Sequence, residues 1–72
     1  MDATQMIDLM NRTPFAPLEI HLNDGARIRV EQPYHVATRQ NSSTFSIYDD
    51  GDRMRIVAFR NVTEVITSTA PG

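Results

Sequence analysis

The residue types that most often carry chemistry are sparse in this sequence and do not converge on one motif. The acidic run Asp49-Asp50-Gly51-Asp52 has the composition of a calcium loop, but it lacks the alternating ligand spacing and the distal glutamate that such loops use. His21 and His35 have no partner side chains at the spacing of a zinc site. The chain has no cysteine, no glycine-rich phosphate loop and no serine in a nucleophile motif. We therefore predict no enzyme activity, no cofactor and no metal.

The basic residues have a composition that suits binding better than catalysis. All seven are arginine and none is lysine. The arginine guanidinium is planar and matches phosphate and carboxylate groups, and Tyr34, Tyr48 and Phe59 lie among these arginines as rings on which bases stack. Two plainer alternatives are codon usage with solvated arginines and aromatic rings that pack on a pleated sheet. The net charge of −2 argues against a dedicated nucleic-acid binder.

The elements that position these residues begin with a helix over residues 2–12. Asp2 and Gln5 have the spacing of a capping box. The apolar side chains recur at helical spacing: Ala3, Met6, Ile7 and Met10. Pro14 ends the helix. A helix this short is marginal alone in water, so we expect its methionine-rich face to pack on its own domain or on a neighbouring subunit.

Two alternating segments, residues 18–22 and 26–31, predict a first hairpin. A two-residue loop at Asp24-Gly25 would mix charged and apolar side chains on one face. A three-residue loop at 23–25 instead gives the pairs Leu22 with Ala26, Ile20 with Ile28 and Leu18 with Val30, and on the other face Glu19 with Arg29 and His21 with Arg27. Only this register keeps one face apolar, so we predict a type I turn with Gly25 in the left-handed conformation.

Residues 44–48 and 53–59 predict a second hairpin around an Asp50-Gly51 turn. A two-residue type I′ loop gives the pairs Ile47 with Met54 and Phe45 with Ile56. Val57 and Phe59 then lie on the opposite face of a strand that is apolar on both sides. Such a strand is covered on both faces, by the helix or by a second subunit.

The remaining segments complete a single domain, residues 1–72. Pro33 interrupts the ladder, and residues 34–37 are interpreted as a bulged continuation of the second strand. Residues 60–63 predict a tight turn, 64–67 a closing strand and 68–72 a flexible tail. The predicted core is Leu18, Ile20, Leu22, Ile28, Val30, Phe45, Ile47, Met54, Ile56 and Val65. The predicted fold is an N-terminal helix followed by a five-stranded antiparallel SH3-like or Sm-like barrel over residues 15–67.

The short chain favours self-association, and its N-terminal residues and apolar segments indicate where the protein is located. A domain of 72 residues buries little surface, and without disulfides or metals self-association is the remaining common source of stability. The first residues include Asp2 and Asp8 and show no basic region followed by an apolar run. No stretch approaches the roughly 20 apolar residues of a membrane span. We expect a cytoplasmic location and no membrane partner.

Residues 13–67 resemble two groups of proteins. The first is a group of small uncharacterised bacterial proteins, which share the start Pro14-Phe15-Ala16-Pro17-Leu18, the Asp24-Gly25 hairpin and the Gln32-Pro33 turn, and it implies no function. The second is the Sm-like fold, including the bacterial Sm-like RNA chaperone. Phe59-Arg60-Asn61-Val62 occupies the place of its second motif, with Asn61 where that motif has glycine, and the Lys-His pair of the bacterial chaperone is missing.

These observations give one leading hypothesis and one alternative for function. The leading hypothesis is a non-enzymatic interaction module: a homo-oligomeric small β-barrel that binds a protein partner, with Val57, Phe59, Met6 and Met10 at the oligomer interface. The alternative, implied by the resemblance to Sm-like proteins, is RNA binding through Arg39, Arg60, Asn61 and Tyr34.

Overall fold

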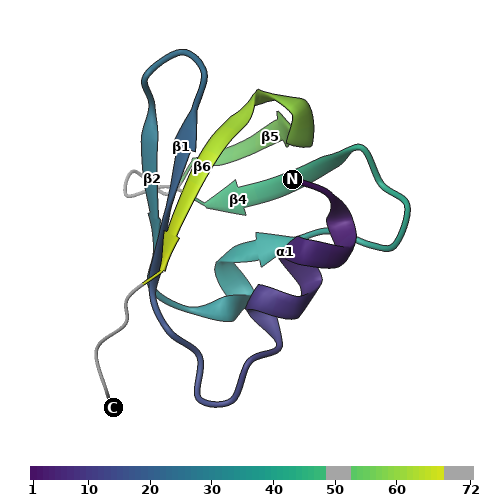
Figure 1. Ribbon diagram of the computed structural model, residues 1–72, viewed down its shortest axis with the longest axis vertical. Coiled ribbons are helices and arrows are strands. Elements are labelled where there is room, and N and C mark those ends of the chain that lie inside the picture. Colours follow the sequence, from purple (N-terminus) through teal and green to yellow (C-terminus); the bar gives the residue numbers. More distant parts are fainter. Residues whose placement is uncertain (49–52, 68–72) are drawn as a thin grey trace.

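The chain folds into one helix, six strands and two 3₁₀ turns, in a computed structural model that describes residues 1–48 and 53–67 (Figure 1). In chain order these elements are α1 (Ala3–Met10), β1 (Leu18–Leu22), β2 (Arg27–Val30), η1 (Pro33–His35), β3 (Val36–Ala37), β4 (Thr44–Tyr48), β5 (Met54–Ala58), η2 (Phe59–Asn61) and β6 (Val62–Thr67). The mostly β character that the sequence predicts is confirmed. The predicted tail, 68–72, lies outside the described residues.

The described strands form two separate three-stranded antiparallel sheets, in the orders β2-β1-β6 and β3-β4-β5. The prediction of a five-stranded antiparallel SH3-like or Sm-like barrel is therefore wrong. In a barrel or an orthogonal sandwich, a strand that bends from one sheet into the other makes the corner. Here Pro33 opens a 3₁₀ turn, and residues 36–37 pair with β4 instead of extending β2. The chain thus crosses between the sheets at η1 and η2, through turns and not along a bent strand.

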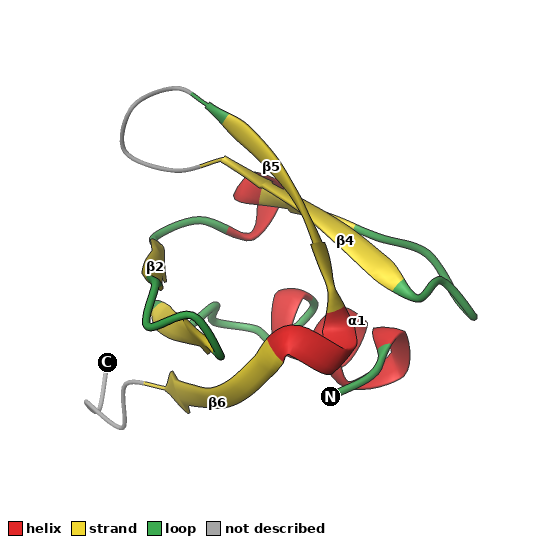
Figure 2. Cartoon of the chain, turned by 90° about the horizontal axis from the view of Figure 1, so that it is seen from above, coloured by secondary structure: helices red, strands yellow, loops and turns green. Residues whose placement is uncertain are grey.

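The capping box at the start of α1 is confirmed. The backbone N–H of Gln5 donates to Asp2 Oδ1 at 2.9 Å, and the backbone N–H of Asp2 donates to Gln5 Oε1 at 3.1 Å. These bonds satisfy donors that the first turn of a helix leaves free. The helix buries Ala3 and Met6 in the core cluster to which both sheets contribute, and it lies beside β4 in both views of the chain (Figure 1 and Figure 2).

The first hairpin has the predicted register. Leu18 lies opposite Val30 and Ile20 opposite Ile28, and the other face pairs Glu19 with Arg29 and His21 with Arg27. The N–H of Leu22 donates to the carbonyl of Ala26 at 2.9 Å across the turn. Gly25 has a φ of 89°, in the left-handed region that a G1-bulge loop requires and that a β-carbon disfavours.

The second hairpin differs from its predicted register by one residue. Phe45 pairs with Val57, and Ile47 pairs with Arg55. Because the side-chain period of a strand is two, a slip of one residue moves every β5 side chain to the other face. The predicted Asp50-Gly51 turn lies outside the described residues.

This shift changes the composition of the core. Met54 and Ile56, which the sequence places inside, are 57% and 69% exposed, whereas Val57 and Phe59 are buried. The Phe59 ring packs on Phe45, with centroids 4.9 Å apart. Val65 is half-buried against the core. The buried apolar residues form one cluster: Ala3, Met6, Leu18, Ile20, Leu22, Ile28, Val30, Phe45, Ile47, Val57 and Phe59.

Within residues 1–48 and 53–67, no helix has the length and apolar character needed to cross a membrane.

Candidate functional site

Two of the four residues predicted to bind RNA border the same short segment. Arg39 and Arg60 are both exposed. Arg39 lines a shallow groove of about 280 Å³ and Arg60 one of about 320 Å³, and Ser42 and Thr44 line both. The Ser42 and Thr38 hydroxyls each donate to the Thr44 carbonyl at 2.9 Å. Two arginines therefore flank a segment whose conformation is held by its own hydroxyl groups.

Asn61 has a structural role in the described fold. Its backbone carbonyl accepts a bond from the Asn23 N–H at 2.8 Å, and its side-chain Oδ1 accepts one from Asn23 Nδ2 at 3.3 Å. These bonds tie η2 to the turn of the first hairpin. The carbonyl groups of Asn61 are therefore engaged within the chain.

Tyr34 lies on η1. The residue is 76% exposed, and its ring meets the His35 ring edge-on, with centroids 4.9 Å apart. It lines a third groove, of about 530 Å³, together with Met10 and Val36, between α1 and β3. This groove shares Ala37 and Thr38 with the groove of Arg39, so Tyr34, Arg39 and Arg60 line neighbouring grooves and not a single one.

The residues predicted to form the oligomer interface are mostly inside the single chain. Met6, Val57 and Phe59 are at most 5% exposed, and only Met10 is half-buried. The prediction assumed that one face of β5 needed a second subunit to cover Val57 and Phe59. In the observed register these two side chains point into the core of their own chain, and Met54 and Ile56 on the opposite face of β5 are exposed.

Charged residues gather on the outer face of the β2-β1-β6 sheet, which we name the charged face: Glu19, His21, Arg27, Arg29 and Glu64. His21 Nε2 lies 2.5 Å from Glu19 Oε1, and its Nδ1 lies 3.4 Å from Glu64 Oε1. The hydrogen bond with His21 holds the pKa of the Glu19 carboxyl below its usual value, against the opposing effect of desolvation and with the help of the positive charges nearby.

This cluster is not arranged as a metal centre. Both ring nitrogens of His21 face carboxylates. Among residues 1–48 and 53–67 no group of three or more His, Cys, Asp or Glu has an arrangement that could hold a metal ion. The ionic contacts of the charged face join His21 to Glu19 and Glu64, and Arg29 to Glu31.

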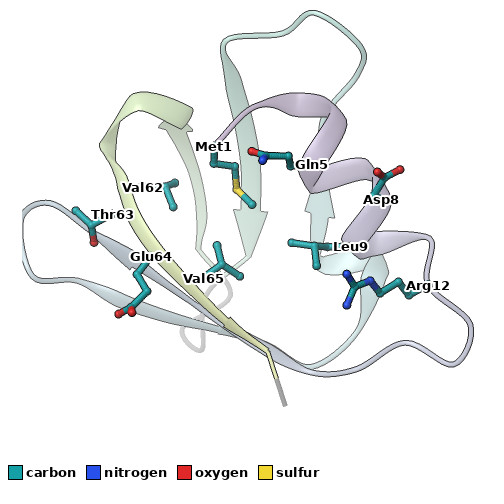
Figure 3. Close-up of a pocket in the computed structure, with 9 residues that line it drawn as sticks. All are labelled: Met1, Gln5, Asp8, Leu9, Arg12, Val62, Thr63, Glu64 and Val65. Carbon is teal, nitrogen blue, oxygen red and sulfur yellow. The ribbon is translucent and has the colours of Figure 1, made fainter. Parts of the chain in front are cut away.

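A groove of about 420 Å³ separates α1 from β6 (Figure 3). Leu9, Val62 and Val65 point into it, and Gln5 and Arg12 lie along its helix side. The walls carry no pair of a nucleophile and a base in contact. The groove can accept a side chain of a ligand, but nothing in it specifies a reaction.

The outer face of the β3-β4-β5 sheet has a different composition from all of these sites. Residues opposite one another in an antiparallel pair share a face, and the register pairs Tyr48 with Met54, Ser46 with Ile56, Thr44 with Ala58 and Ala37 with Ser46. We name these seven residues the uncharged face, because none of them carries a charge at neutral pH. Tyr48, Met54 and Ile56 are 50%, 57% and 69% exposed. Adjacent large apolar side chains in water are typical of an interaction surface.

The sequence reasoning missed this face because the signal for it was ambiguous. From residue 54 to residue 59 both alternating sets of side chains include large apolar residues. Only the length of the turn decides which set is buried, and nothing in the strands themselves fixes that length. The comparisons with known proteins give no independent guide, since no family model, curated protein or solved structure matches the chain.

Proposed function

We propose that this chain is a non-enzymatic interaction module that self-associates through its uncharged face. The observation that carries the proposal is the exposure of Tyr48, Met54 and Ile56 side by side on one sheet. Packing within the chain does not account for these exposed side chains, because Val57 and Phe59 are the residues of this segment that fill the core. A surface of this kind is stabilised when another protein covers it.

Magnitudes indicate how strong such an association is. Burying one side chain of this size contributes about 1.5–3 kcal/mol. Bringing two molecules together costs on the order of 4–15 kcal/mol in lost translational and rotational freedom. The favourable and unfavourable contributions are similar in size. We therefore expect an assembly that forms at moderate protein concentration and dissociates on dilution.

The charge pattern makes the proposal specific. Because none of the seven residues of the uncharged face carries a charge at neutral pH, association through them depends less on salt than association through charged side chains. Binding to nucleic acid would instead weaken steeply as salt rises, because it releases counterions from phosphates. Salt dependence thus separates the leading proposal from its alternative.

RNA binding is the second candidate function, and one observation favours it. Arg39 and Arg60 are both exposed and border the segment from Ser42 to Thr44. RNA that co-purifies with the protein, raises its absorbance at 260 nm relative to 280 nm and is lost in high salt would support this candidate. In that case an Arg39→Ala, Arg60→Ala double variant is expected to lose it.

Light scattering with a matched pair of variants tests the leading proposal. Ile56→Asp places a charge on the uncharged face, and Ile66→Asp places one on β6, where Ile66 is 48% exposed and lies opposite Glu19. We expect wild type and Ile66→Asp to exceed the 8.2 kDa of one chain as concentration rises, and Ile56→Asp to remain at that mass. A wild-type mass that stays at 8.2 kDa over a hundredfold range of concentration would reject the proposal.

A further inference from the structure

The two sheets leave four strands at their edges: β2, β6, β3 and β5. An edge strand exposes backbone N–H and C=O groups that can pair with another chain, and proteins guard such edges with charges, prolines or short length. β2 carries Arg27 and Arg29 on alternate positions, and β3 has only two residues. β6 is bordered by α1 across the groove of Figure 3.

β5 is the least guarded of these edges. Its neighbour in the sheet is β4, and the described part of the chain places no strand on its other side. It has five residues, no proline and a single charged residue, Arg55. Ile56, at its centre, is the most exposed of the large apolar residues on the uncharged face.

The sequence of β5 is complementary to itself when two copies run antiparallel. With Ile56 opposite Ile56 of a second copy, Met54 lies opposite Ala58 and Arg55 opposite Val57, so all five residues of the strand are paired. Met54 and Ala58 combine a long side chain with a short one, and the two isoleucines meet directly. Like charges are never opposed in this register.

The neighbouring registers are worse. Registers displaced by one residue would place side chains of the uncharged face opposite side chains that point into the core. A displacement of two residues in one direction brings Arg55 opposite Arg55 of the other copy, which is destabilising. The same displacement in the other direction brings Arg55 opposite Phe59, which belongs to η2 and not to the strand. The central register is the only one that pairs the full length of β5.

We propose that two copies of this chain join edge to edge through β5, antiparallel, about a two-fold axis at Ile56. This inference rests on the proposed self-association and names the strand and register that carry it. The contact is isologous, so each copy contributes the same surface. It supplies backbone hydrogen bonds along both strands, as in other cases of strand addition. It also brings Ile56, Met54 and Ala58 of the two copies into contact across the junction, which removes part of the uncharged face from water.

Cysteine cross-linking tests the arrangement directly, because the chain contains no cysteine of its own. Residues directly opposite in an antiparallel pair have Cα atoms about 4.5–5.5 Å apart, inside the range of about 4.4–6.8 Å that a disulfide spans. We expect Ile56→Cys to form a disulfide-linked dimer under mild oxidation. At micromolar protein its rate should exceed that of the control Ile66→Cys by on the order of a hundredfold, since thiols held together have an effective concentration of about millimolar or more.

A second pair of variants tests the register. Met54→Cys and Ala58→Cys should cross-link efficiently when mixed, since these positions lie opposite one another in the proposed pairing. Each variant alone should cross-link no faster than Ile66→Cys. Hydrogen exchange of the backbone amides tests the arrangement in the wild-type protein, without any substitution. The exchange of residues 54–58 should become slower as the protein concentration rises, whereas the exchange of β2 should not change.

The outcomes separate the two proposals. Assembly seen by light scattering without preferential cross-linking of Ile56→Cys would overturn the edge-to-edge arrangement and leave self-association standing. Equal cross-linking of Met54→Cys alone and of the mixture would overturn the register. A wild type that stays monomeric would overturn both proposals.

Discussion

The outer faces of the two sheets are built from opposite kinds of side chain. On the charged face His21 lies between two glutamates, and Arg29 and Arg27 of β2 lie opposite Glu19 and His21 of β1. On the uncharged face Tyr48, Met54 and Ile56 are exposed to water. The inner faces of both sheets contribute side chains to the same core. The difference therefore says nothing about packing within the chain and instead indicates which side is left for a partner.

The largest expected effect tests whether the inner and outer sides of the β3-β4-β5 sheet differ as described. Ile47 is fully buried and Ile56 is exposed. Ile47→Ala should reduce the free energy of unfolding by about 2–5 kcal/mol. Ile56→Ala, measured at a concentration where the protein is monomeric, should stay within roughly 0.5 kcal/mol of wild type.

Urea denaturation of both variants gives this comparison. Ile20→Ala, on the inner side of the other sheet, is the matched control and should resemble Ile47→Ala, since Ile20 is equally buried. A large loss of stability in monomeric Ile56→Ala would show that the register of the second hairpin is the one first expected from the sequence.

A smaller effect concerns the turn that fixes the first hairpin. A β-carbon built on Gly25 meets nothing within 4 Å, so the cost of Gly25→Ala comes from the backbone alone. With φ at 89° we expect a loss of about 1–2 kcal/mol. Thermal unfolding measures it, with Asp24→Ala as a separate variant that removes the side-chain bond to the Ala26 N–H. Unchanged stability of Gly25→Ala would contradict the left-handed turn.

The smallest expected effect distinguishes the two outer faces by pH. The pKa of Glu19 is lowered in the folded chain, so its contribution to stability is complete above the pKa of the unfolded chain, near 4.5. That contribution is lost as the pH falls through the lowered folded value. Wild type should therefore exceed Glu19→Gln in stability near neutral pH, and the difference should shrink in acid below the unfolded pKa.

The matched control for this experiment lies on the uncharged face. Met54→Leu changes no ionisable group, so its difference from wild type should be the same at every pH. Urea midpoints measured from neutral to acidic pH give both curves. A constant difference between wild type and Glu19→Gln would show that the His21 contact does not stabilise the folded chain.

The two hairpins show how far the sequence could predict this fold. In the first, charged residues alternate strictly with apolar ones, so only one register keeps charges out of the core. In the second, Ile56 and Val57 are interchangeable by hydrophobicity, and the wrong one of them was placed inside. The helix cap at Asp2 was predictable for the same reason as the first hairpin, because its signal is local.

The candidate site was less accessible to sequence reasoning than the fold. The proposed RNA-binding set joined residues of two segments, 34–39 and 60–61, and their spatial relation depends on how the two sheets are connected. Pro33 begins the turn that holds Tyr34 and carries the chain to the second sheet. The uncharged face exists only because of the one-residue difference in the second hairpin, so no inspection of single residues could have located it.

The pairing of β1 with β6 has a consequence for how the chain folds. Leu18 lies opposite Thr67, so the central strand of this sheet acquires its second neighbour from near the far end of the described chain. Bringing such distant segments together costs loop-closure entropy before any contact compensates for it. A two-stranded hairpin is at best marginally stable by itself. The backbone amides of β1 and β2 should therefore be protected from hydrogen exchange only after the chain through β4 and β5 has folded and β6 has paired with β1. We therefore expect slow, cooperative folding for so small a chain, as is usual where contacts are remote in sequence.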